Sequence, residues 1–403
     1  EWQIISPDLT RPHPEVPESI GDFRTPGLES MRRRAVIYAV DGSPLDEKII
    51  WAGTDDGLVH VTRNGGASWH DVTPPELKSW DKVSQVDAGH FSEATAYIAI
   101  NAIRKSDMRP HIYKTHDGGR SWQHIVNGLP DMGPVNVVRE DPRQPGLLYA
   151  GTEREVYFSI DDGAHWQSLR MNMPASSIRD LVIHENDLVI GTHGRSIWIL
   201  DNISHLRELA GNTGTTLFSP PTAFRVRWNM FLDTPLPPEE PTGENPPDGA
   251  ILDFYLDRDA TSVSTEILDE NSHLVRRFSS ADPEVEVDTT ALPHPTYWIR
   301  PPQRIQVGRG HHRFFWDLRH TPPEGARRDF SIAAVYRRTP MGPHGPFVHP
   351  GKYLVRLTVD GRSFEKQLDV KMDPRVDISD EGLMLQSEYS MACYRSYREA
   401  QEI

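Results

Sequence analysis

The sequence predicts an all-β protein. Two features carry the prediction: an eight-residue motif that occurs three times, and a strong hairpin signal near the end of the chain. The motif reads Ser/Thr-x-Asp/Asn-x-Gly-x-x-Trp and occupies residues 62–69, 115–122 and 159–166. Each copy lies between short apolar-alternating runs, which places it at the turn of a hairpin. Repeats of about 40–50 residues with four short strands each are typical of a β-propeller.

Each position of the motif has a structural purpose in this prediction. The hydroxyl and the Asp/Asn side chains bond backbone N–H groups, the glycine adopts a positive φ, and the Trp folds over apolar neighbours. Asn64 replaces Asp in the first copy, which a hydrogen-bonding role tolerates and a catalytic carboxylate would not. The predicted structural residues are Thr62, Asn64, Gly66, Trp69, Thr115, Asp117, Gly119, Trp122, Ser159, Asp161, Gly163 and Trp166.

Four blade-like units are expected between residues 35 and 204. In the first three, a fourth strand follows the motif Trp, whereas the last unit has no motif. The expected strands are 35–40, 49–54 and 59–62; 83–87, 96–101 and 111–115; 135–139, 147–152 and 156–159; and 178–184, 188–192 and 196–201.

Residues 1–34 read as an outer strand followed by a linker. Trp2 occupies the motif-Trp position, and the strand 2–6 follows it. This strand either completes the fourth unit of a four-bladed ring or belongs to a blade whose other strands precede residue 1. We expect the second arrangement, in which the chain is the C-terminal portion of a larger protein and its N-terminal half is a partner.

A second β domain is expected after a Pro-rich connector at 205–248. Its strands are predicted at 251–256, 264–268, 274–278, 313–318, 353–359 and 364–370, and Asp360-Gly361 signals a type I′ hairpin. About six short strands over 249–373 predict a β-sandwich of immunoglobulin or fibronectin III type, with Trp316 in its core. Residues 374–403 read as the start of a helix, with Leu385, Tyr389, Cys393, Ser396 and Ala400 on one face.

The motif copies resemble the Asp boxes of sialidases, sortilin-type (Vps10) receptors, two-propeller xyloglucanases and the photosystem II assembly-factor group. A narrower resemblance is to large bacterial BNR-repeat proteins described as glycosyl hydrolase relatives. Residues 5–10, 51–57, 191–201 and 242–247 carry it. The second domain is similar to the Ig-like domain of flagellar hook-capping proteins at 266–269, 315–318 and 350–353. These resemblances are specific for fold and weak for function.

Composition narrows the range of partners. The 403 residues carry a formal net charge of −15, which argues against nucleic acid or an anionic membrane surface as a partner. No apolar run reaches the roughly 18 residues of a membrane span. Cys393 is the one cysteine, so an internal disulfide is excluded. The histidines lack transition-metal spacing and Gly308-Arg309-Gly310 lacks the lysine of a phosphate loop, so we expect no metal and no cofactor.

Function is expected on the face formed by the loops between second and third strands, together with the inter-blade loops. These loops are charged, and their arginines could grip a carboxylate bidentately. The alternative is a solvated rim of salt bridges without a ligand. The candidate binding residues are Asp55, Asp56, Arg104, Arg109, Glu153, His193 and Arg195.

Two functions stay open. The resemblance implies an extracytoplasmic binding or scaffold module that recognises peptide, protein or glycan, in the manner of sortilin-like propellers. The other is a glycoside hydrolase of the sialidase or xyloglucanase type, which needs two carboxylates about 5–10 Å apart. Asp55, Asp56 and Glu153 are available for that purpose, but the Arg-Ile-Pro motif of sialidases is absent from the sequence. We assign no catalytic residue and prefer the binding module.

Overall fold

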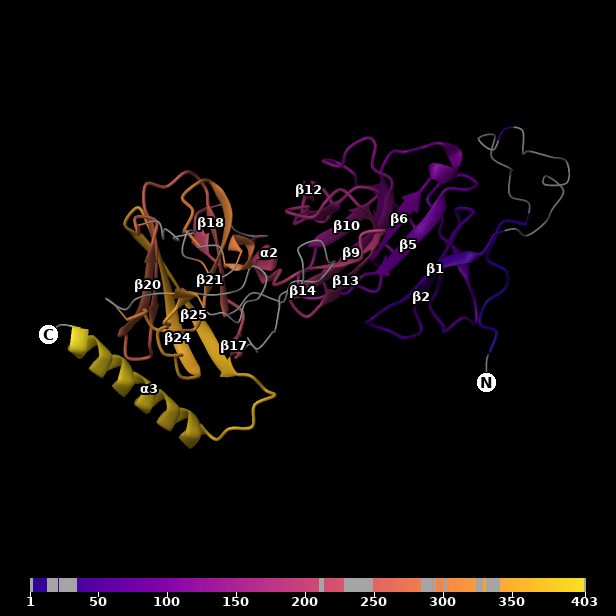
Figure 1. Ribbon diagram of the computed structural model, residues 1–403. Coiled ribbons are helices and arrows are strands. Elements are labelled where there is room, and N and C mark those ends of the chain that lie inside the picture. Colours follow the sequence, from indigo (N-terminus) through magenta and orange to yellow (C-terminus); the bar gives the residue numbers. More distant parts are fainter. Residues whose placement is uncertain are drawn as a thin grey trace. The chain divides into compact units, whose positions relative to one another are not determined.

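The computed structural model describes residues 3–12, 21, 35–209, 214–227, 249–283, 292, 295–300, 303–323, 329–330 and 341–401 (Figure 1). They belong to two compact units, Glu1–Ala210 and Gly211–Ile403. Strands dominate both units, which confirms the predicted all-β fold. None of the helices among the described residues has the length and apolar character needed to cross a bilayer.

The first unit consists of four antiparallel sheets in which strands adjacent in sequence pair with one another. Strands β3, β6, β7 and β11 have the predicted bounds, and the others differ at their ends. The strands are β1 (Ile37–Gly42), β2 (Ile50–Thr54), β3 (Val59–Thr62) and β4 (His70–Asp71); β5 (Lys82–Ala88), β6 (Ala96–Asn101), β7 (His111–Thr115) and β8 (Gln123–His124); β9 (Val135–Glu140), β10 (Leu148–Thr152), β11 (Val156–Ser159) and β12 (Gln167–Ser168); and β13 (Ser177–His184), β14 (Asp187–His193) and β15 (Ile197–Leu200). The described residues of the unit also form the short helices η2 (Ile103–Lys105) and α2 (Ser204–Leu209).

The four sheets are the blades of the unit, and each packs against the next in chain order. In Figure 1 they follow one another from β1 to β14. Apolar clusters fill each seam because the strands expose one apolar face to the neighbouring sheet. Two glycines allow the close approach: a Cβ on Gly53 would lie 2.3 Å from Val83 Cγ1, and one on Gly151 would lie 2.5 Å from Ile178 Cγ2.

The motif turns have the hydrogen bonds that their chemistry predicts. In each copy the Ser/Thr hydroxyl accepts a 2.9 Å hydrogen bond from the backbone N–H of the motif glycine. The Asp/Asn Oδ1 accepts a 2.9 Å hydrogen bond from the backbone N–H of the residue immediately before the Trp. Each Trp indole then reaches across the seam. Trp122 donates to the Val72 carbonyl at 2.7 Å, and Trp166 donates to the Ile125 carbonyl at 2.9 Å. The motif therefore links each blade to the preceding one.

The segment at the start of the chain accepts a hydrogen bond from a motif indole, as the blades do, but it does not form the predicted strand. Trp69 donates a 2.8 Å bond to the carbonyl of Ile5. Val72 and Ile125 each stand three residues after a motif Trp, and Ile5 stands three residues after Trp2. Ile5 thus occupies the place of a preceding blade's outer segment, but residues 3–6 form no strand, and Trp2 lies outside the described residues.

The second unit is a sandwich of two sheets around a common apolar core. Trp316 lies in that core and is fully buried, as predicted. The three-stranded sheet orders β16 (Thr216–Leu217), β18 (Ala250–Leu256) and β21 (Gly310–Trp316); the five-stranded sheet orders β17 (Ala223–Arg225), β25 (Arg362–Met372), β24 (Gly351–Val359), β19 (Val263–Leu268) and β20 (Leu274–Ser279). A helical turn η3 (Thr296–Trp298) and the pair β22 (Asp329–Phe330) and β23 (Met341–Gly342) lie between these strands in sequence.

Two details of this unit refine the sequence interpretation. The hairpin between β24 and β25 turns at Asp360 and Gly361, whose φ values of 47° and 85° are the positive pair that a type I′ turn needs. The described part of the expected connector 205–248 contributes α2 to the first unit and β16 and β17 to the sheets of the second. The stretch 228–248, with most of the prolines, lies outside the described residues.

The C-terminal helix α3 (Asp380–Gln401) is present where the pattern changes to a helical period. Its packing face differs from the predicted one. Leu383 is buried, whereas Leu385, Tyr389 and Cys393 are exposed. The polar Ser387 and Ser390 stand on the more covered side, so counting apolar residues selected the wrong face.

Candidate binding surface

The loops between second and third strands meet at one face of the first unit, which we call the rim (residues 55–58, 102–110, 153–155 and 194–196, with their ion-pair partners). Contacts across the three seams bring the first three of these loops together. Arg104 Nη1 lies 2.9 Å from Asp55 Oδ2 and joins blades 2 and 1. Asn136 accepts a 2.8 Å bond from Asn101 and donates a 3.1 Å bond to Glu153. Arg179 of β13 pairs with Glu153 at 3.2 Å and joins blades 4 and 3.

Two of the candidate residues lie beneath the rim rather than on its surface. Asp55 is 6% exposed, and its carboxylate accepts bonds from the Val36 N–H (2.9 Å) and from Arg104. Asp56 is fully buried, and it accepts bonds from the Thr54 hydroxyl (2.5 Å) and the Arg11 N–H (2.8 Å). Buried carboxylates need such donors. These two acids therefore hold loops in place instead of facing a ligand, which corrects the expectation from the sequence.

Arg109 forms a local pair within its own loop. Its guanidinium donates to both oxygens of Asp107 at 2.9 and 2.7 Å, while 69% of the side chain stays exposed. The hydrogen bond from Arg109 is the main reason that the pKa of Asp107 lies well below its ordinary value. Asp107 therefore stays ionised and fixes the arginine at the surface.

The arginine and lysine ion pairs of the rim share one pattern: the acid is the more covered partner and the base is the more exposed one. The side-chain exposures are 9% for Asp55 against 48% for Arg104, and 20% for Glu153 against 46% for Arg179. Lys105 and Asp81 follow it, at 25% against 10%. The rim therefore presents cationic groups although the whole chain is strongly acidic.

His193 and Arg195 flank the β14–β15 turn, and both are exposed. The turn is closed by the Thr192 hydroxyl, which donates to the Ser196 carbonyl at 2.6 Å, and by the Trp198 indole, which donates to the Arg195 carbonyl at 2.9 Å. These contacts fix the backbone and leave the two side chains at the surface. Within the described part of the chain, no hydrogen bond or ion pair links them to the other rim residues.

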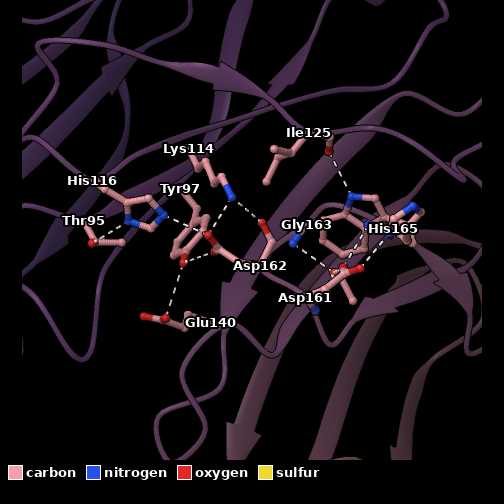
Figure 2. A network of polar contacts seen from close by, with 12 residues as sticks. Thr95, Tyr97, Lys114, His116, Ile125, Glu140, Asp161, Asp162, Gly163 and His165 are labelled. Atoms are coloured by element: carbon pink, nitrogen blue, oxygen red, sulfur yellow. Dashed lines mark hydrogen bonds and ion pairs between the residues drawn. The ribbon is translucent and has the colours of Figure 1, made fainter. Parts of the chain in front are cut away.

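A hollow of about 310 Å³ opens on the opposite face, which carries the motif turns and is called the motif face below. Figure 2 shows three blade-2 side chains converging on Asp162. The Tyr97 hydroxyl donates to Asp162 Oδ1 at 2.8 Å, and Lys114 Nζ lies 2.6 Å from Oδ2. His116 Nε2 lies 2.8 Å from Oδ2. A carboxylate only accepts, so His116 donates from Nε2, and its Nδ1 lies 3.0 Å from the Thr95 hydroxyl.

The electrostatics of this group keep its charges fixed. Burial raises the pKa of Asp162, but hydrogen bonds from Lys114, Tyr97 and His116 outweigh burial and leave that pKa below its ordinary value. Burial, together with the charges of Glu140 and Asp162, raises the pKa of Tyr97 far above its ordinary value, so the side chain remains a phenol. The Tyr97 oxygen lies 3.4 Å from Glu140 and 2.8 Å from Asp162. It thus fills the space that a scissile bond between two catalytic carboxylates would need.

Sequence reasoning did not single out this group, although one signal was present. Asp162 stands at the fourth motif position, where the other copies have Gly65 and Gly118. All three have positive φ, at 57°, 68° and 74° respectively. Asp tolerates this conformation better than most residues but pays a strain that glycine avoids. An Asp in place of glycine at this position therefore indicates that the side chain makes contacts that offset the backbone strain.

The comparisons with known proteins leave the family of this chain open. No protein-family model matches the chain. The oligoxyloglucan-reducing end-specific xyloglucanase of Emericella nidulans is 27% identical over 104 residues, which are 26% of this chain and 13% of that enzyme. The chain thus matches only a small fraction of this curated relative's length.

Solved structures give a similarly partial likeness. YCF48 bound to D1 peptide matches 41% of this chain and 51% of its own, with a TM-score of 0.34 and 21% identity. The GH74 xyloglucanase from Xanthomonas campestris matches 55% of this chain and 34% of its own, with a TM-score of 0.34 and 17% identity. An ancestral GH74 enzyme matches 83% of this chain and 40% of its own, with a TM-score of 0.34 and 14% identity. Likeness at this level carries no argument about function.

Proposed function

We propose that the first unit is a non-catalytic binding module whose rim recognises carboxylate groups of a peptide, protein or acidic glycan. The supporting observation is the pattern of the rim arginine pairs, in which Arg104, Arg109 and Arg179 are each more exposed than the acid that they contact. A guanidinium that is already oriented by a buried acid loses little side-chain entropy when it pairs with a ligand. We further propose that the module acts outside the cytoplasm.

The net charge of −15 does not oppose this proposal. Charges farther away than about 8 Å are largely screened at physiological ionic strength, so a ligand carboxylate responds mainly to the rim cations next to it. The overall charge would slow the approach of an acidic ligand and leave the contact itself intact. Salt screens the attraction between the ligand carboxylate and the rim cations, so binding should weaken as salt is added.

The hydrolase alternative receives less support. Of the three carboxylates that the sequence offered for it, Asp55 and Asp56 are buried and bonded to backbone and arginine, and Glu153 is bonded to Asn136 and Arg179. On the motif face, the Tyr97 hydroxyl stands between Glu140 and Asp162. Each of these five acids already accepts a hydrogen bond from a protein group.

The proposal is tested by titrating the full chain with a fluorescein-labelled glutamate-rich peptide and measuring anisotropy. Alanine at Arg104, Arg109 or Arg195 should each weaken binding by about 1–3 kcal/mol. Arg143 is the matched control: it is an exposed arginine in the β9–β10 loop on the motif face, bonded to Asn186 at 3.0 Å. Arg143→Ala should bind as the wild type does.

Thermal melting accompanies each titration because Arg104→Ala also removes a donor from buried Asp55. Equal affinity in the wild type and in all three rim variants, each of them folded, would remove the rim as the binding surface.

A further inference from the structure

A second hollow, of about 380 Å³, lies in the second unit beside helix α3. Its walls come from β17, from the segment that follows β21 and from α3, the terminal helix in Figure 1. Arg225 and Arg319 face it from the sheet side, and Ser390, Tyr394 and Tyr397 face it from the helix. Neither arginine was noted in the sequence, and the rim plays no part in this site.

Arg225 is a buried cation that has no acidic partner in the part of the chain that the structure describes. The residue is 6% exposed. Its guanidinium donates to the Val348 carbonyl at 3.3 Å and to the Gln386 side chain, and it lies 4.9 Å from the centre of the Phe347 ring. No carboxylate among the described residues forms an ion pair with it. Burial lowers the pKa of Arg225, as expected for a charge held away from water.

Arg319 brings a second guanidinium to the same aromatic ring. Its central carbon lies 3.5 Å from the Phe347 ring centre, and Nη1 donates to the Gly345 carbonyl at 3.1 Å. Burial is the main reason that its pKa is lowered, and the charge of Arg225 contributes in the same direction. Asp317 acts in the opposite direction, yet within the described ranges no ion pair joins it to Arg319.

A buried cation beside a second, partly buried one imposes a cost that an anion would relieve. Buried charges are normally paired, and an unpaired one costs several kcal/mol. Carbonyl oxygens and an aromatic face satisfy part of each guanidinium without neutralising its charge. Arg225 lies close enough to Arg319 to lower the pKa of Arg319, and both arginines border an open hollow.

We propose that this hollow binds the oxyanion of a small organic ligand, a phosphate or a carboxylate, between Arg225 and Arg319. The forked geometry of two guanidinium groups suits both anions. The hydroxyl of Ser390 and the rings of Tyr394 and Tyr397 line the remaining space, so the organic part of the ligand is small and at least partly apolar. Helix α3 is thereby one wall of a ligand site.

The test is calorimetric titration of the full chain with phenyl phosphate, benzoate and inorganic phosphate. The variants are Arg225→Met and Arg319→Met, which keep much of the side-chain volume and remove the charge. The matched control is Arg356→Met in β24, because Arg356 already pairs with Glu365 at 2.7 Å. Each pocket variant should bind about tenfold more weakly or worse, and the control should bind as the wild type does.

Thermal melting separates a ligand site from a purely structural pair of arginines. Ligand should raise the melting temperature of the wild type and of Arg356→Met, and not that of Arg225→Met. Without ligand, Arg225→Met should melt at the wild-type temperature or above it, because an unpaired buried charge has been removed.

The ligand series also identifies the anion. If phenyl phosphate binds and benzoate does not, the site is specific for phosphates. If benzoate binds and phenyl phosphate does not, the site is specific for carboxylates. The proposal is overturned if the wild type binds none of the three compounds, or if Arg225→Met and Arg319→Met bind them as tightly as the wild type. A large loss of stability in Arg225→Met together with unchanged binding would give the arginine a structural role only.

Discussion

On the motif face, acids and bases of neighbouring blades are bonded to one another, whereas on the rim the arginines of the ion pairs remain largely at the surface. Lys114 illustrates the first pattern: its side chain is 10% exposed and ends on Asp162 of the next blade. Arg104 illustrates the second: it also reaches the neighbouring blade, but 48% of it remains exposed. An ion pair between neighbouring blades therefore stabilises the seam in both cases, and where its base is exposed it also leaves that base accessible to a ligand.

The difference follows from how each face is built. On the motif face, the indoles of Trp122 and Trp166 and the Asp162 group connect adjacent blades through short polar contacts. On the rim, the loop 102–110 carries charges beyond the ends of its strands, whereas the loops 55–58 and 153–155 are short turns. We therefore expect substitutions on the motif face to change stability and substitutions on the rim to change binding.

The largest stability loss is expected for Trp166→Ala. The indole is 4% exposed and donates to the Ile125 carbonyl of the preceding blade. Removing it leaves a cavity and an unsatisfied acceptor, at a cost of about 3–5 kcal/mol in the free energy of unfolding. Urea denaturation measures this cost. Trp69→Ala provides the comparison, because Trp69 is less buried and should cost clearly less; equal losses would contradict the seam argument.

A somewhat smaller loss is expected for Asp162→Gly. Glycine suits the positive φ of 57°, so backbone strain is relieved and the effect comes from the side chain. Lys114, which is 8% exposed, then loses its carboxylate, at a cost of about 2–3 kcal/mol. Adding Lys114→Met should restore much of the stability. A double variant no more stable than Asp162→Gly would show that the charge pair is not the cause.

A pH effect is expected from Asp87, also on the motif face. Burial raises the pKa of this carboxyl to about 6 despite its contact with Arg139 at 3.0 Å. A folded-state pKa above the unfolded value means that the contribution is complete below about pH 4 and is lost as the pH rises through 6. Asp87→Asn should remove this slope. Unfolding free energies of both proteins between pH 4 and 7 test it, and parallel curves would refute the assignment.

The repeat made most of the propeller unit predictable, because apolar alternation and the motif turn are local signals. Tyr97 and Lys114 meet Asp162 across a seam, and no local pattern encodes that meeting; only the Asp in place of glycine hinted at it. Asp55 and Asp56 were expected at the surface because loop acids usually are, but tertiary donors such as the Arg11 N–H bury them. Arg225 escaped notice for a similar reason, since its surroundings come from Phe347 and Gln386, both far away in sequence.

The most direct test of the account is one titration with two readouts. An oligogalacturonide and a glutamate-rich peptide are added separately to the wild type and to the triple variant Arg104→Ala/Arg109→Ala/Arg195→Ala, and the ligand is recovered for mass spectrometry. We expect the triple variant to lose affinity about a hundredfold or more for whichever ligand the wild type binds, with every recovered ligand intact. Unchanged affinity in the folded triple variant, or shortened oligosaccharides produced by the wild type, would contradict a non-catalytic binding rim.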